Sequence, residues 1–177
     1  MKKNILIFGG ILGTILCVNM VVMINLMMSN PDFKGNDLLG YVAMVVVFSL
    51  IYFGIRNYRN KQLDGFITFG KAFKTGFFIA LIASTMYVVT WLFYYYLFVP
   101  DFLDYYIDYV LKLTPEAELA DKTQEMENFK EMYKNPLFVV LVTYAEVLPV
   151  GLVVALISSL ILKKKNTGNE KKASVTS

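Results

Sequence analysis

One acidic side chain interrupts a long uncharged stretch of the sequence, and it is the first residue that could do chemistry. Glu146 is the only charged residue between Asn135 and Leu162. A carboxyl group near the centre of a membrane helix costs about 2.5–3.5 kcal/mol to insert, so it needs a proton or a partner. Pro149 follows three residues later. Because proline lacks an N–H and crowds the preceding turn, it should kink the helix and free the carbonyl of Ala145.

Two other polar residues should lie at the depth of Glu146. At a rise of about 1.5 Å per residue, Asn19 and Thr90 come within several ångströms of its level in their own apolar stretches. We therefore predict an intramembrane polar layer, beside the turn that Pro149 distorts, made of Asn19, Thr90, Glu146 and the carbonyl of Ala145. The acid has three interpretations: a protonated group that holds helices together, a carrier of a proton or cation, or a contact to a partner protein.

The scarcity of other reactive side chains narrows the chemistry. The chain has no histidine and a single cysteine, Cys17. Histidine-dependent catalytic triads, zinc sites and haem ligation by histidine are therefore excluded, and no intrachain disulfide can form. Asp101, Asp104 and Asp108 share one helical face, but their spacing does not match a calcium-binding EF-hand loop. No nucleophile and base pair is recognisable, so we expect no enzyme, no cofactor, no bound metal and no nucleic-acid partner.

Four apolar stretches must position Glu146 and its neighbours. They cover residues of about 4–28, 38–55, 72–99 and 136–162. Crossing a hydrocarbon core of about 30 Å takes about 20 helical residues, within a working range of about 17–25, and all four stretches reach that range. We therefore predict an all-α integral membrane bundle of four transmembrane helices. It forms one domain, residues 1–165, in contact with membrane lipid.

Two segments outside the spans have patterns of their own. Residues 101–134 carry nine acids against four lysines. Phe102, Tyr106 and Leu113 recur there at helical spacing, on a face other than that of the aspartates. We predict an external amphipathic helical segment between spans three and four, folded as a hairpin. Residues 166–177 are polar and are expected to form a disordered cytoplasmic tail.

The distribution of basic residues predicts the orientation. Segments on the cytoplasmic side of membrane proteins carry an excess of Lys and Arg. Counting the N-terminus, the link between spans two and three, and the C-terminal tail together gives 12 of the 17 basic residues. We therefore expect a multi-pass protein of the bacterial cytoplasmic (inner) membrane, with its N-terminus and its C-terminus both cytoplasmic.

Small residues recur at four-residue spacing on three of the spans, where they let helix backbones approach closely. The residues expected to pack in this way are Gly9 and Gly13 in the first span, Gly76 and Ala80 in the third, and Gly151 and Ala155 in the fourth. The pattern does not distinguish packing within one bundle from a homodimer interface, so both stay open.

Several short patterns resemble those of a known family. They are Ile51-Tyr-Phe-Gly-Ile-Arg-Asn-Tyr-Arg-Asn-Lys, then Gly65-Phe-Ile-Thr-Phe-Gly-Lys-Ala-Phe-Lys-Thr-Gly-Phe, and Leu148-Pro-Val-Gly in a span that ends on a lysine cluster. From about residue 4 to about residue 165 the chain resembles the bacterial membrane family catalogued as domain of unknown function 4199. The resemblance implies a four-span inner-membrane protein with no assigned activity, and it carries over no catalytic residues.

Two functional hypotheses of different classes follow. The leading one is a non-enzymatic scaffold or accessory component, working as a homo-oligomer or with another membrane protein. The alternative is a small proton- or cation-coupled transporter or channel that uses Glu146. A dry, heavily aromatic interior around Glu146 would favour the first hypothesis, and a wet cavity open to one side would favour the second.

Overall fold

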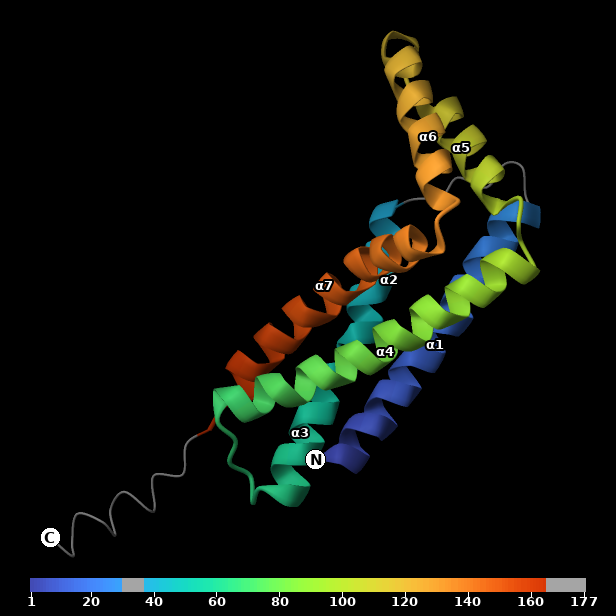
Figure 1. Cartoon of the computed structure of the whole chain (residues 1–177). Coiled ribbons are helices and arrows are strands. Elements are labelled where there is room, and N and C mark those ends of the chain that lie inside the picture. Colours follow the sequence, from blue (N-terminus) through green and yellow to red (C-terminus); the bar gives the residue numbers. More distant parts are fainter. Residues whose placement is uncertain (30–36, 165–177) are drawn as a thin grey trace, which may run out of the picture.

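The chain folds into helices that form a bundle with a hairpin at one end (Figure 1). The computed structural model describes residues 1–29 and 37–164. Over these residues it contains α1 (Lys2–Ser29), α2 (Asp37–Phe48), α3 (Leu50–Gln62), α4 (Phe69–Leu97), α5 (Phe102–Leu113), a short 3-10 helix (Glu116–Glu118), α6 (Leu119–Tyr133) and α7 (Pro136–Leu162). The predicted all-α fold is confirmed. The tail predicted at 166–177 lies outside the described residues.

Four segments of the described chain are long and apolar enough to cross a membrane, as predicted. They are Lys2–Ser29, Gly40–Gln62, Phe69–Leu97 and Pro136–Leu162. The second segment reaches seven residues beyond its predicted end at 55, because α3 continues through its basic residues to Gln62. Arg59 and Lys61 occupy its last turn, where positive charge interacts favourably with the helix dipole and long side chains can extend to the membrane surface.

The second span is divided into α2 and α3 at Ser49, which the sequence pattern did not predict. The Ser49 hydroxyl donates to the carbonyl of Val46 at 2.6 Å, and the Tyr52 amide donates to the Ser49 carbonyl at 3.0 Å. Both bonds reach back three residues, not four, so the helix tightens locally. Serine competes with the helical backbone for its carbonyls in this way, which explains why the interruption falls at this residue.

Helix α4 lies between α1 and α7 and packs closely against both (Figure 1). The small residues predicted to pack stand at these contacts. A Cβ at Gly9 would lie 2.9 Å from Ile82, and one at Gly13 would lie 2.6 Å from Met86, both on α4. Between α4 and α7, a Cβ at Gly76 would lie 2.8 Å from the Cβ of Ala155, and one at Gly151 would lie 2.9 Å from the Cβ of Ala80. These contacts lie within one chain.

Polar contacts join chain segments at the end of the bundle that holds the N-terminus. The Met1 amino group donates to the Gln62 side chain, so the start of α1 meets the end of α3. Ile67, in the link before α4, forms an antiparallel bridge with Lys164 just after α7. Its amide donates to the Lys164 carbonyl at 3.1 Å, and the Lys164 amide donates to its carbonyl at 2.8 Å. Arg59 also donates to the carbonyl of Leu162 at 3.2 Å.

The opposite end of the bundle is formed by the hairpin of α5 and α6, which projects beyond the spans (Figure 1). The predicted helical segment between spans three and four is therefore confirmed. Lys130 of α6 pairs with Asp104 of α5, and both side chains are exposed. Leu103, Met126 and Tyr133 are buried, and Leu103 and Tyr133 belong to an apolar cluster with residues of α1, α4 and α7. The base of the hairpin is thus part of the bundle's core.

Candidate functional site

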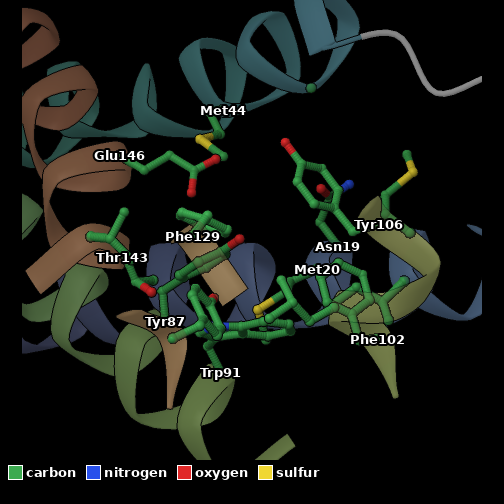
Figure 2. A pocket seen from close by; sticks show the side chains of 16 residues that line it. Asn19, Met20, Met44, Tyr87, Trp91, Phe102, Tyr106, Phe129, Thr143 and Glu146 are labelled. Carbon is green, nitrogen blue, oxygen red and sulfur yellow. The ribbon is translucent and has the colours of Figure 1, made fainter. Parts of the chain in front are cut away.

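A cavity of about 320 Å³ lies where the spans meet the base of the hairpin. Sixteen of the described residues line it, and they come from α1, α2, α4, α5, α6 and α7 (Figure 2). Small-molecule sites in proteins usually measure about 300–1,000 Å³, so this volume suits a small ligand. Most of the lining is apolar or aromatic. The polar groups on it are Glu146, Asn19, Thr143 and the hydroxyls of Tyr87, Tyr106 and Tyr133.

Glu146 belongs to the cavity wall and not to a packed helix interface. Its carboxyl group points into the space beside Met44 and Phe129 (Figure 2). The side chain is exposed although it stands near the middle of α7, because the cavity opens around it. Both Glu146 and Asn19 lie about ten residues, or about 15 Å, from the hairpin end of their helices. The structure therefore brings these two members of the predicted polar site to one cavity.

Thr90 is placed elsewhere, which corrects one member of the predicted site. Its hydroxyl accepts a hydrogen bond from the Cys17 thiol at 3.2 Å, and it lines a separate shallow pocket with Met86 and Val89. Residues four apart share a face of a helix, so Tyr87 and Trp91 of α4 point together into the main cavity. Thr90 is turned by about 100° from Trp91 on the same helix, and its depth in the membrane could not reveal that rotation.

Pro149 and Ala145 also lie off the cavity wall. Helix α7 continues through Pro149, and both residues are exposed on the surface of the helix. They are four residues apart and share one face, whereas Glu146 is turned by about 100° from Ala145. The carbonyl of Ala145 was predicted to join the polar layer, but Ala145 is not among the described lining residues.

The aromatic wall was not recognised in the sequence as part of the site. Six lining residues are aromatic: Tyr87, Trp91, Phe102, Tyr106, Phe129 and Tyr133. Their rings support one another. The indole N–H of Trp91 donates to the Tyr133 hydroxyl at 2.9 Å, and the Trp91 ring meets that of Phe102 edge-on at 5.1 Å. The four-residue spacing of Tyr87 and Trp91 was the available signal, but aromatic residues near the end of a span are also typical of the membrane interface.

The tyrosine at the end of α6 stays neutral. Burial raises the pKa of Tyr133 to about 12, although the hydrogen bond that Trp91 donates favours the phenolate and lowers it. An unperturbed tyrosine has a pKa of about 10, so this phenol keeps its proton at any physiological pH. Over the pH range in which proteins usually work, Tyr133 therefore contributes a dipole and an aromatic ring to the cavity, and no charge.

The lining residues combine one ionisable group with hydrogen-bonding groups and an aromatic surface. In residues 1–29 and 37–164 no three acidic or cysteine side chains gather to hold a metal ion. Glu146 is the only acidic group on the described wall, and no lysine or arginine faces it there. Such a wall offers one ionisable carboxyl group, several hydrogen-bonding groups and a large aromatic surface. These are the properties of a pocket that selects a small molecule by charge and shape.

Comparison with known proteins places the chain in a described group. A family model with the description "Protein of unknown function (DUF4199)" matches residues 7–164, which include most of the first candidate span, the other three spans and the hairpin. No curated protein and no solved structure matches the chain.

Proposed function

The chain belongs to the DUF4199 family, which is described only as of unknown function, and we propose that it is a membrane carrier for a small solute. In this proposal it is a non-enzymatic, multi-pass protein of the bacterial inner membrane. It binds a small solute in the cavity between its spans and exchanges a proton or cation at Glu146. The wall is heavily aromatic, which was expected of a scaffold, but the cavity is open, which was expected of a transporter. The position of Glu146 on the wall of this open cavity is the observation that carries the proposal.

The alternative role of Glu146 as a packing group fits this position less well. An acid that holds helices together by a hydrogen bond should be enclosed between them, since the gain comes from the low dielectric of a dry interface. Glycine and alanine residues let α4 approach α1 and α7 closely instead, with Ala80 and Ala155 fully buried. Ionisable residues that face a cavity inside a membrane protein usually mark the path of an ion or substrate.

A scaffold or accessory role is the second candidate, and a different observation favours it. The hairpin of α5 and α6 projects beyond the spans, and its acidic side chains are exposed where another protein could contact them (Figure 1). A homo-oligomer or a complex with another membrane protein could use this surface. The two candidates differ in what Glu146 must do, because a scaffold needs no titrating group in the cavity.

Proton movement in proteoliposomes tests the carrier directly. Purified wild-type protein and the Glu146→Gln variant are reconstituted with a pH-sensitive dye inside. Gradients of sodium, potassium, phenyl glucoside, benzenesulfonate and phenyltrimethylammonium are then imposed in turn. We expect at least one gradient to drive proton movement through the wild type and none through the variant, because an amide keeps the size and polarity of the acid but cannot titrate.

Asp108→Asn serves as the matched control. It also removes one acid, but from the exposed face of the hairpin and not from the cavity. It should behave as the wild type does. If none of the five gradients produces movement that depends on Glu146, the carrier proposal fails and the scaffold becomes the better hypothesis.

A further inference from the structure

We propose that the solute of this cavity is a small lipophilic organic cation, an ammonium group with apolar substituents held between Glu146 and the aromatic wall. This inference rests on the proposed function, because it names the class of solute that the cavity takes. It goes further by committing to charge, size and polarity. Each of these follows from a separate property of the described lining.

The sign of the charge follows from the ionisable groups on the wall. Glu146 is acidic, and no basic side chain is present among the described lining residues. Charges attract more strongly inside a protein than in water because the effective dielectric constant is lower, so an ionised carboxylate there strongly prefers a positive ligand. The faces of Tyr87 and Trp91 on the same wall also attract a positive charge and repel an anion. The wall therefore selects cations.

The kind of cation follows from the ligands that the wall does not offer. Hard metal ions take six or more oxygen ligands, and several of those are usually carboxylates. The described wall supplies one carboxylate together with apolar chains such as those of Met20, Met23, Ile24 and Met44. An organic cation needs fewer polar partners, because its apolar substituents gain from contact with such chains.

The aromatic rings supply the second half of the recognition. A cation within about 6 Å of an aromatic face is attracted by the ring quadrupole, and tryptophan and tyrosine are the most effective partners for quaternary ammonium groups. Trp91, Tyr87 and Tyr133 all line the cavity with Glu146. Contact between the Trp91 ring and Phe102, and the bond from Trp91 to Tyr133, hold this surface in place before a ligand arrives. Few side chains then lose conformational freedom when the ligand binds.

The charge in the cavity stays balanced when the cation enters if Glu146 gives up a proton. A protonated carboxyl group releases one proton to water as one cation enters, so the net charge inside the membrane does not change. Among the described lining residues, the titratable groups are Glu146 of α7, Tyr87 of α4, Tyr106 of α5 and Tyr133 of α6. Phenols stay protonated well above neutral pH. The affinity for a cation should therefore rise with pH as Glu146 ionises.

The single tryptophan of the chain makes binding directly measurable. Trp91 is the only tryptophan in the sequence, and it lines the cavity, so tryptophan emission reports on this site alone. The full chain, in lipid nanodiscs built with a scaffold protein that lacks tryptophan, is titrated with phenyltrimethylammonium and, separately, with tert-butylbenzene. These two probes share a shape but differ by one positive charge. Calorimetry in parallel detects any binding that leaves the emission unchanged.

We expect the cation to bind and the Glu146→Gln variant to bind it at least about tenfold more weakly, the loss typical when one partner of an enclosed charge pair is removed. Binding of tert-butylbenzene should be the same in both proteins. The wild-type affinity for the cation should rise with pH as Glu146 loses its proton, and that of the variant should stay flat. Asp108→Asn, which removes an acid outside the cavity, should bind the cation as the wild type does.

Replacing a ring tests the aromatic part separately. Phe129→Leu keeps an apolar side chain on the cavity wall and removes one aromatic face. It should weaken binding of phenyltrimethylammonium more than binding of tert-butylbenzene, because only the cation interacts with the ring quadrupole.

Two results would overturn the inference. Equal affinity for the two probes, insensitive to Glu146→Gln, would identify an apolar pocket with no preference for charge. Absence of cation binding by both measurements would also reject the class, even if another gradient drove Glu146-dependent proton movement in proteoliposomes. The carrier proposal would stand in that last case, so the two proposals fail independently.

The same chemistry occurs in free amines and in the choline headgroup of a lipid, and the choice of nanodisc separates them. If the headgroup is the natural occupant, phenyltrimethylammonium should bind more weakly in phosphatidylcholine nanodiscs than in phosphatidylglycerol nanodiscs, because choline competes. Equal affinity in the two lipids would identify a free cation. Both results support the cationic class, and they assign its source.

Discussion

Trp91 is one residue at which a membrane span, the hairpin and the cavity meet. It stands near the hairpin end of α4, is 6% exposed, and donates its indole N–H to Tyr133, the last residue of α6. Tyr133 is similarly enclosed, so neither partner can replace the bond with one to bulk water. A buried donor that loses its acceptor keeps the full cost of its desolvation. This bond therefore adds to the apolar contacts that hold the base of the hairpin against the bundle.

Removing the acceptor should loosen that junction. Tyr133→Phe keeps the ring and deletes the hydroxyl, which leaves the Trp91 donor unpaired and should lower the stability of the protein by about 1–3 kcal/mol. Thermal unfolding in detergent, followed by circular dichroism, measures the loss, and the emission of Trp91 should shift at the same time. Tyr105→Phe removes a hydroxyl from an exposed tyrosine of the same hairpin and should change neither quantity. Equal stability of the two variants would show that the bond contributes nothing.

At the scale of the elements, helices α4 and α7 approach each other closely. Gly76 faces Ala155 and Gly151 faces Ala80, so each glycine lies against an alanine of the other helix. Phe48 of α2 also reaches the same level and is fully buried. In a membrane the helices gain little from the hydrophobic effect, so this close contact contributes mainly by dispersion and by interhelical packing.

A single methyl group should disturb this contact. In Gly151→Ala the new Cβ would lie 2.7 Å from a ring carbon of Phe48 and 2.9 Å from the Cβ of Ala80, both shorter than normal contact. We expect a loss of about 1–3 kcal/mol through overpacking. Gly10→Ala is the matched control, because a Cβ there would meet nothing within 4 Å. The control should be neutral, or more stable by up to about 1 kcal/mol through helix propensity. If both variants unfold at the wild-type temperature, the α4–α7 contact is not tight.

The sequence predicted the elements well because each depends on local pattern. Long apolar stretches gave the four spans, and the periodic aromatic and acidic residues after Asp101 gave the helical hairpin. The sequence did not predict features that depend on how each helix is rotated about its axis or on contacts between segments far apart in the chain. Asn19, Thr90 and Glu146 were grouped by depth, but only the first and the last face the cavity. The aromatic wall was missed for the same reason, since it combines residues of α4, α5 and α6.

At the scale of the whole molecule, the two ends of the bundle differ in charge. The end with Met1, Gln62 and the Ile67–Lys164 bridge carries most of the basic residues, and the end with the hairpin carries most of the acidic ones. Because basic segments are retained in the cytoplasm, we expect the hairpin and the mouth of the cavity on the outer side of the membrane. A carrier in this orientation would receive its solute from outside or release it there.

Cysteine labelling tests the orientation. In a Cys17→Ser background, a single cysteine at Gln124 of the hairpin should react with an impermeant maleimide on intact cells. A cysteine at Asn60, near the end of α3, should react only after the inner membrane has been opened. Both positions are exposed, so access to the reagent depends on the side of the membrane alone. Labelling of the Asn60 cysteine in intact cells would reverse the proposed orientation.

The bridge between Ile67 and Lys164 also sets an order for the assembly of the protein during synthesis. Its two partners are about a hundred residues apart in the chain, and everything between them is the third span, the hairpin and the fourth span. Chains are synthesised from the N-terminus, so Ile67 leaves the ribosome long before its partner exists. The link before α4 can therefore form these two bonds only after α7 and the residues that follow it have been synthesised. A nascent chain that stops short of Lys164 would hold all four spans and still lack the two hydrogen bonds that close the bundle.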